Sequence, residues 1–207
     1  MKSQKSIPSW KLSATVTTCL ALILSLGSCS SSSTPTDPDG SGNAASTLVI
    51  NMIDDPTDEI CELWVYIRDI RVKPDGQSQK LLGTEIGEFE LLALQDGPAA
   101  PIGEWVVDSG TYQFIEILLD EASSYVIELD LDDPGDPENP NCLETPSALQ
   151  IPSAKFKVNG GPFSVSGETT VTIDFDAKKS LKRKGSPDNP RGWQLNPKVS
   201  IVEVNKG

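Results

Sequence analysis

The chain has 207 residues, with 17 lysines and arginines against 30 aspartates and glutamates, and its net charge at pH 7 is −13. A surface this acidic repels nucleic acid and attracts cations, which argues against nucleic-acid binding. Histidine is absent, so the chain lacks the usual general base and the commonest transition-metal ligand.

The first 28 residues have the three-part organisation of an export signal. Lys2, Lys5 and Lys11 form a basic region, and the segment 12–26 that follows is largely apolar. A membrane-spanning helix needs about 20 apolar residues, so this segment is too short to span and instead suits a secretory signal peptide. We therefore expect residues 1–28 to be removed on export.

The tetrapeptide "LGSC", residues 26–29, ends the apolar segment. It resembles the lipobox of bacterial lipoproteins, in which an aliphatic residue and two small residues precede a cysteine. In that class the thiol receives a diacylglyceryl group, and cleavage makes the cysteine the first residue. The resemblance implies that Cys29 is lipidated and anchors the protein to a membrane. The alternative is an ordinary signal peptide with an unrelated cysteine.

Residues 29–46 form the predicted tether between this anchor and the folded domain. Ser, Thr, Pro, Asp and Gly dominate the segment, and such a composition cannot bury a core. Ser30 stands where an aspartate would favour retention in the inner membrane. We therefore expect an exported protein that is anchored to the outer membrane or cell surface of a bacterium.

Residues 47–207 predict a single all-β domain, an antiparallel β-sandwich. Short runs of alternating apolar and polar residues lie between clusters of Gly, Pro, Asn and Asp, which is typical of sandwiches and barrels. Asn159 and Gly160 predict a hairpin turn, and Pro197 predicts a bulge or an edge position in the last strand. The predicted strands are 47–53, 63–72, 80–82, 88–92, 104–107, 112–119, 124–129, 154–158, 163–166, 169–176 and 194–204.

Two of the four cysteines are candidates for a disulfide bond. Cys19 lies in the signal peptide and Cys29 in the lipobox, which leaves Cys61 and Cys142 in the domain. Exported compartments are often oxidising, so we expect these two to pair. The alternative is a pair of buried free thiols.

Six segments in chain order carry a family resemblance. They are "NMIDDPTDEICELWVYIRDIRVK" (51–73), "FELLALQDG" (89–97), "SGTYQFIEILL" (109–119), "PSALQIPSAKFKV" (146–158), "VTIDFDAKKSL" (171–181) and "WQLNPKVSIVEV" (193–204). Together they resemble the bacterial and archaeal lipoprotein domain catalogued as domain of unknown function 4382. The resemblance implies a sandwich of the transthyretin-like or carbohydrate-binding-like kind, and it brings no established activity.

An acidic loop is the candidate metal site. Ca²⁺ takes six to eight oxygen ligands, which a carboxylate-rich loop can supply. The loop lacks the flanking helices of an EF-hand, so any site would be a looser one. The sequence thus offers Ca²⁺ as a candidate cofactor, and the alternative is a solvated acidic loop. The carboxylates belong to Asp130, Asp132, Asp133, Asp136 and Glu138.

A candidate ligand-binding face lies on the predicted strand 63–72. Trp64 and Tyr66 point to the same side as Glu62 and Arg68, while the residues between them form an apolar face. Aromatic rings beside charged groups on an exposed sheet could stack on sugar rings. The alternative is that a loop or the second sheet covers them.

A basic segment, "KKSLKRKG" at residues 178–185, contrasts with the acidic remainder of the chain. It could dock anionic polysaccharide, or it could be a solvated connection that pairs with the acidic loop.

The sequence contains no motif that indicates catalysis. It has no Gly-x-Ser-x-Gly elbow and no phosphate-binding loop. We therefore predict a non-catalytic binding module for an extracellular glycan or envelope component, with polysaccharide or an envelope protein as partner. The alternative is a structural or assembly subunit of the cell envelope without a small-molecule ligand.

Overall fold

The computed structural model describes residues 44–54, 57, 60–94, 98–130, 132–133, 135–136, 139–186 and 189–207. The predicted signal peptide, Cys29 and residues 30–43 of the tether lie outside the described residues. The described residues all belong to a single compact unit, Ser41–Gly207. Among them, no helix is long and apolar enough to span a membrane.

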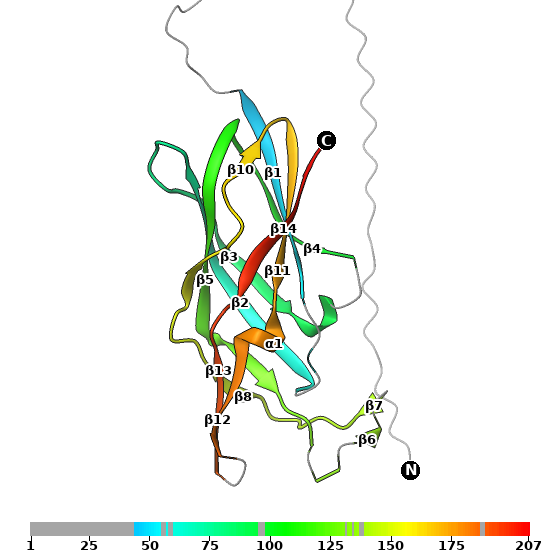
Figure 1. Ribbon diagram of the computed structural model, residues 1–207. Helices are drawn as coiled ribbons and strands as arrows, with labels where there is room; N and C mark the ends of the chain where they lie inside the picture. Colours follow the sequence, from blue (N-terminus) through cyan, green and yellow to red (C-terminus); the bar gives the residue numbers. More distant parts are fainter. Residues whose placement is uncertain are drawn as a thin grey trace, which may run out of the picture. The chain divides into compact units, whose positions relative to one another are not determined.

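Two β-sheets pack against each other in a sandwich (Figure 1). The smaller sheet has four strands in the order β14-β11-β1-β4. This confirms the predicted all-β sandwich. The bounds of these strands are Val199–Lys206 for β14, Glu168–Phe175 for β11, Ala45–Ile53 for β1 and Ala100–Asp108 for β4.

The larger sheet contains the strands that carry the candidate binding face. Its order is β12-β13-β8-β5-β2-β3, and the short strands β9 and β10 also pair with β5. The bounds are Leu181–Ser186 (β12), Asn189–Leu195 (β13), Ser147–Gln150 (β8), Gly110–Ile127 (β5), Glu62–Pro74 (β2), Lys80–Glu90 (β3), Lys155–Lys157 (β9) and Phe163–Val165 (β10). Outside both sheets lie the ribbon of β6 (Gly135–Asp136) and β7 (Asn139–Pro140), the 3₁₀ turn η1 (Leu92–Leu94) and the helix α1 (Ala177–Ser180).

One hydrophobic core fills the space between the sheets. Alternate residues of each strand supply it, because successive side chains of a strand point to opposite faces. In β1 the core residues are Leu48, Ile50 and Met52, all fully buried. In β2 they begin with Leu63 and Val65, which turns the residues between them toward the outer face of the larger sheet.

Strand directions are mixed within both sheets. Most neighbours are antiparallel, but β1 pairs with β11 in parallel and β13 pairs with β8 in parallel. Both pairs join strands that are far apart in the sequence, so no tight turn requires an antiparallel direction. The parallel pairs therefore arise from long-range packing, which the alternation pattern does not encode.

The hairpin predicted at Asn159 and Gly160 is wrong. The strands on either side of it, β9 and β10, both pair with β5 rather than with each other. Asn159 instead pairs with the other sheet: its N–H donates to the Val199 carbonyl (2.9 Å), and its carbonyl accepts from the Ile201 N–H (2.7 Å). The N–H and carbonyl groups of Asn159 thus have their hydrogen-bond partners in β14, so pairing between β9 and β10 is not needed to satisfy them.

The predicted last strand, 194–204, is also divided. Its first residues belong to β13 in the larger sheet, and the remainder forms β14 in the smaller sheet. Pro197 lies between the two strands and offers no N–H for a ladder. The chain therefore changes sheets at the proline.

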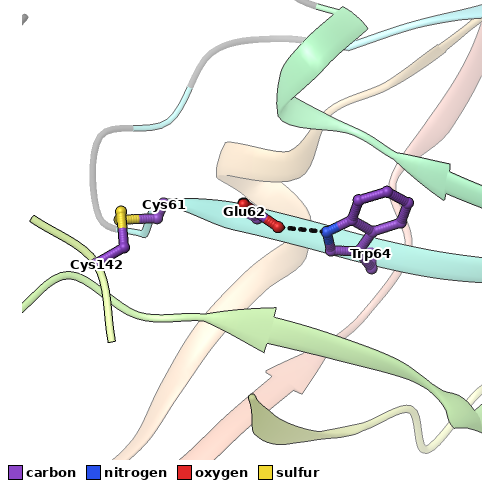
Figure 2. Close-up of a disulfide and its surroundings, with 4 residues drawn as sticks. All are labelled: Cys61, Glu62, Trp64 and Cys142. Atoms are coloured by element: carbon purple, nitrogen blue, oxygen red, sulfur yellow. Dashed lines mark hydrogen bonds between the residues drawn. A yellow bond between two sulfur atoms is a disulfide. The ribbon is translucent and has the colours of Figure 1, made fainter. Parts of the chain in front are cut away.

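The predicted disulfide is confirmed. Cys61 and Cys142 are bonded with an S–S distance of 2.03 Å and a Cα–Cα distance of 6.1 Å. Figure 2 shows the bond just before β2, with Glu62 and Trp64 following on the strand. Cys142 also forms a bridge with Leu129 beyond β5. The bond thus joins the start of β2 to the segment after β7 that bridges to Leu129, just beyond β5.

We predict that the double substitution Cys61→Ser and Cys142→Ser lowers the free energy of unfolding by about 4–5 kcal/mol, because the bond closes a loop with a sequence separation of 81. Urea denaturation of the oxidised protein measures the change. The matched control is Cys19→Ser with Cys29→Ser, which leaves the domain unaltered. Alkylation of Cys61 or Cys142 in the denatured, unreduced protein would contradict the bond itself.

Candidate functional site

Three aromatic side chains gather on the outer face of the larger sheet. Trp64 and Tyr66 come from β2, Tyr125 comes from β5, and all three are half-buried. Trp64 and Tyr125 are direct cross-strand partners, with ring centroids 6.0 Å apart and ring planes inclined by 19°. We call these three residues the aromatic platform. It presents apolar ring surface on a sheet face whose other side is committed to the core.

Five carboxylates surround the aromatic platform and form what we call the acidic rim. Strand pairing sets Glu90 opposite Trp64, and it sets Glu88 and Asp120 on either side of Tyr66. Three neighbouring strands therefore contribute to one surface. The residues of the acidic rim are Glu62 on β2, Glu85, Glu88 and Glu90 on β3, and Asp120 on β5.

Two carboxylates of the rim bind the polar ends of the rings directly. The indole Nε1–H of Trp64 donates to Glu62 Oε2 at 2.6 Å (Figure 2). The Tyr66 hydroxyl donates to Glu85 Oε2 at 2.8 Å. Hydrogen bonds to ionised acceptors are stronger than neutral ones. They hold the rings of Trp64 and Tyr66 in defined orientations at the surface.

The acidic rim changes the titration of the two tyrosines. The hydrogen bond to Glu85 raises the pKa of the Tyr66 phenol above its ordinary value of 10.0, and burial and the charges of Glu85, Asp120 and Glu88 raise it further. Burial raises the pKa of Tyr125, and the charges of Glu88 and Glu62 add to the effect. Both rings therefore lie in a negative potential.

Glu90 has a structural role within the rim. Its carboxylate accepts the backbone N–H groups of Leu63 (3.2 Å), Leu92 (3.0 Å) and Ala93. Burial raises the pKa of Glu90, and the charge of Glu62 raises it further. The three hydrogen bonds from the backbone lower the pKa and so oppose both effects. Glu90 thus ties the turn η1 to β2 beside Trp64. Two other members of the rim, Glu85 and Glu88, are exposed to solvent.

A serine positions the junction between Tyr66 and Tyr125. Opposite β2 the register of β5 shifts, so that Trp64 faces Tyr125 while Tyr66 faces Asp120. The Ser124 hydroxyl accepts the Tyr66 N–H at 3.0 Å and donates to the Asp120 carbonyl at 2.7 Å. Because Ser124 is buried, these bonds satisfy backbone groups that the irregular pairing would otherwise leave without partners.

A groove continues the aromatic platform beyond Tyr125. It lies along β5 and the residues of β8 and has a volume of about 590 Å³, which is in the size range of small-molecule sites. Its lining includes Glu121, Ser124, Tyr125, Pro146, Ala148 and Gln150. Tyr125 therefore belongs to both the platform and the groove, and a long ligand could contact both.

The structure brings together three of the four residues predicted for the ligand-binding face. Glu62, Trp64 and Tyr66 meet as expected. Arg68 is exposed farther along β2, where its Nε lies 3.9 Å from Asp69 Oδ1. The sequence reasoning missed Tyr125 and the rim residues on β3 and β5. Tyr125, Glu88 and Glu90 lie within predicted strands, whereas Glu85 and Asp120 lie where β3 and β5 extend beyond the predicted bounds. Which of these side chains become neighbours depends on the register between strands.

Comparison with known proteins agrees with the sequence resemblance. The family described as domain of unknown function (DUF4382) matches residues 45–197. The chain belongs to the DUF4382 family. The matched part of the DUF4382 domain runs from β1 to β13 and contains the aromatic platform and the acidic rim. Neither the curated proteins nor the solved structures include a significant match to this chain.

In this DUF4382 domain, the described part of the predicted calcium loop forms a turn. Asp130 Oδ1 accepts the backbone N–H groups of Asp132 (3.1 Å) and Asp133 (3.3 Å), while the side chain of Asp136 and the whole of Glu138 lie outside the described residues. Within the described part of the chain, no three acidic or cysteine side chains are grouped so as to hold a metal ion. The calcium site stays a prediction.

The basic segment of the DUF4382 domain is divided between α1 and β12. Asp176 caps α1 by accepting the Lys179 N–H at 2.8 Å. In β12, Arg183 contacts Glu128 Oε2 at 3.2 Å and lies over the Trp193 ring. Arg183 of the basic segment therefore forms an ion pair close to the start of the acidic loop at Asp130.

Substituting Glu85 by alanine should lower the pKa of Tyr66 toward 10.0. The change removes both the hydrogen bond that stabilises the neutral phenol and one of the negative charges that disfavour the phenolate. NMR titration of the tyrosine ring carbons measures this, with Tyr66→Phe to assign the signal. Glu104→Ala, at an exposed position of β4, is the control and should leave the pKa unchanged. An unaltered Tyr66 titration in Glu85→Ala would contradict the assignment.

Proposed function

We propose that the protein is a non-catalytic binding module for an extracellular glycan or glycan-bearing envelope component. The supporting observation is the aromatic platform, whose three partly exposed rings lie beside carboxylates that accept their hydrogen bonds. One of the rings, Tyr125, also lines the groove along β8. This combination of ring surface with a few oriented polar groups is what binding sites for small organic molecules offer.

The chemistry of a sugar ring matches both parts of this surface. A pyranose has an apolar face of C–H groups, which loses contact with water when it covers an aromatic ring. Its hydroxyl groups donate hydrogen bonds, and ionised carboxylates are strong acceptors. The rings would supply contact area while the exposed carboxylate of Glu88 helps to fix the orientation of the sugar.

The anchoring part of the proposal rests on the N-terminal sequence. Residues 26–29 resemble a lipobox and residues 1–28 resemble a signal peptide. A disulfide between Cys61 and Cys142 fits export to an oxidising compartment. We propose that Cys29 carries the lipid and that residues 30–44, which precede β1, hold the domain away from the outer membrane or cell surface.

A structural role in the envelope is the second candidate. It is favoured by apolar side chains on the outermost strands: Val106 on β4 is 78 % exposed and Leu81 on β3 is 53 % exposed. An edge strand can accept a strand from another chain. In that case the protein would be an assembly subunit without a small-molecule ligand.

The binding proposal predicts a positive result on an array of glycans and envelope polysaccharides probed with the oxidised full chain. Trp64→Ala should reduce the signal by at least about fivefold, since stacked aromatic contacts contribute roughly 1 kcal/mol beyond area burial. Val106→Ala, at an exposed site on the other sheet, is the control. A blank array for wild type would favour the structural role.

The anchoring proposal predicts that the full chain incorporates a labelled fatty acid when it is expressed in a bacterium. Cys29→Ser should abolish the label because the thiol is the acceptor, and the variant should leave the membrane fraction. Cys19→Ser is the matched control and should be labelled as wild type is. Fatty-acid label retained by Cys29→Ser would refute lipidation at this residue.

A further inference from the structure

We infer that the aromatic platform takes a positively charged sugar, so that its ligand is a polysaccharide containing unacetylated amino sugars. The inference rests on the proposed function and narrows it to a ligand class. It follows from how the protein distributes its ion pairs, from the rings that the acidic rim encloses, and from the groove beside them.

The carboxylates of the rim differ from several other acidic groups on the larger sheet. Asp69 contacts Arg71 at 2.9 Å, and Glu116 contacts Lys155 at 3.1 Å. Within the residues that the structure describes, none of the five rim carboxylates forms an ion pair with a lysine or an arginine. Glu90 and Asp120 accept hydrogen bonds from neighbouring residues of the chain, whereas Glu85 and Glu88 are exposed to solvent and leave their negative charge for an external cation.

The surface beneath this charge is suited to an ammonium group. Cations are attracted to the faces of Trp and Tyr rings, and carboxylates form charge-assisted hydrogen bonds to them. The acidic rim supplies the carboxylates and the aromatic platform supplies the rings. The hydrogen bond to Glu85 raises the pKa of Tyr66 and burial raises the pKa of Tyr125, and the charges of the rim carboxylates raise both further. An anionic sugar would meet repulsion here.

The shape of the surface favours a sugar chain over a bare metal ion. No group of three metal-binding side chains occurs among the described residues, whereas ring surface and a groove of about 590 Å³ follow one another along β5 and β8. A chain of amino sugars offers repeated ammonium groups for the rim and C–H faces for the rings, and its next residues would enter the groove.

The experiment compares two oligosaccharides of equal length by calorimetry with the oxidised full chain. One is the β-1,4-linked glucosamine oligomer, whose amines are protonated in the mildly acidic buffer used for the titration, and the other is its fully N-acetylated counterpart. We expect the amine form to bind at least about tenfold more tightly, as charge-assisted hydrogen bonds exceed neutral ones. Added salt should narrow that difference, because screening weakens exposed charge pairs.

Variants separate the contribution of the acidic rim from that of overall charge. Glu85→Gln with Glu88→Gln should weaken binding of the amine form more than binding of the acetylated form, and so reduce the preference for the amine form. Glu104→Gln removes an exposed charge from β4 and should not alter the preference. Trp64→Ala should weaken binding of both sugars, with circular dichroism verifying that each variant is folded.

Three outcomes would overturn the inference, and they differ in what they imply for the proposed function. Equal affinity for both oligosaccharides would reject the charge preference and leave glycan binding standing. Binding of neither, together with a blank glycan array, would reject both. Glucosamine-oligomer binding that survives Trp64→Ala, or that polylysine matches, would indicate general attraction of polycations or of basic peptides in place of a sugar site.

Discussion

The pairing of β2 with β5 is the constraint on which the rest of this structure depends. The two strands lie side by side in the larger sheet and share a long register. On one face they direct Leu63 and Val65 into the core. On the other face the same register sets Trp64 against Tyr125. The core and the face that carries the aromatic platform are thus two consequences of one alignment, because a slip of one residue would exchange them.

The alignment holds although β5 is irregular. The register shift opposite Tyr66 costs ladder hydrogen bonds, and Ser124 replaces them within the buried part of the strand. The disulfide between Cys61 and Cys142 joins the residue before β2 to a segment that bridges to Leu129, just after β5. Register, side-chain hydrogen bonds and a covalent link therefore act on the same pair of strands, which is the arrangement expected where a surface must keep its shape.

Charge is distributed unevenly over this acidic protein. Several carboxylates form ion pairs with basic side chains, such as Asp69 with Arg71 and Glu116 with Lys155. The acidic rim keeps its charge and surrounds partly exposed rings instead. Its hydrogen bonds to Trp64 and Tyr66 orient the rings without neutralising the carboxylates. Such a surface is costly for folding, since like charges repel, and the binding role proposed above gives it a use.

The sequence by itself determined that β1, β2 and β11 each have one apolar and one polar face, and that Glu62, Trp64 and Tyr66 share the polar face of β2. It also determined the pairing of Cys61 with Cys142 and the membership of the DUF4382 family. The strand faces follow from the local periodicity of apolar residues, the disulfide from the presence of only two cysteines in the predicted domain, and the family from six similar segments in the same order. Tertiary structure alone decided that Tyr125 and the rim carboxylates of β3 join that face. It also decided that the segment after Pro197 enters the other sheet and that Asn159 pairs with β14. Strand register and sheet choice depend on contacts between residues far apart in the chain, and periodicity within one strand carries no information about them.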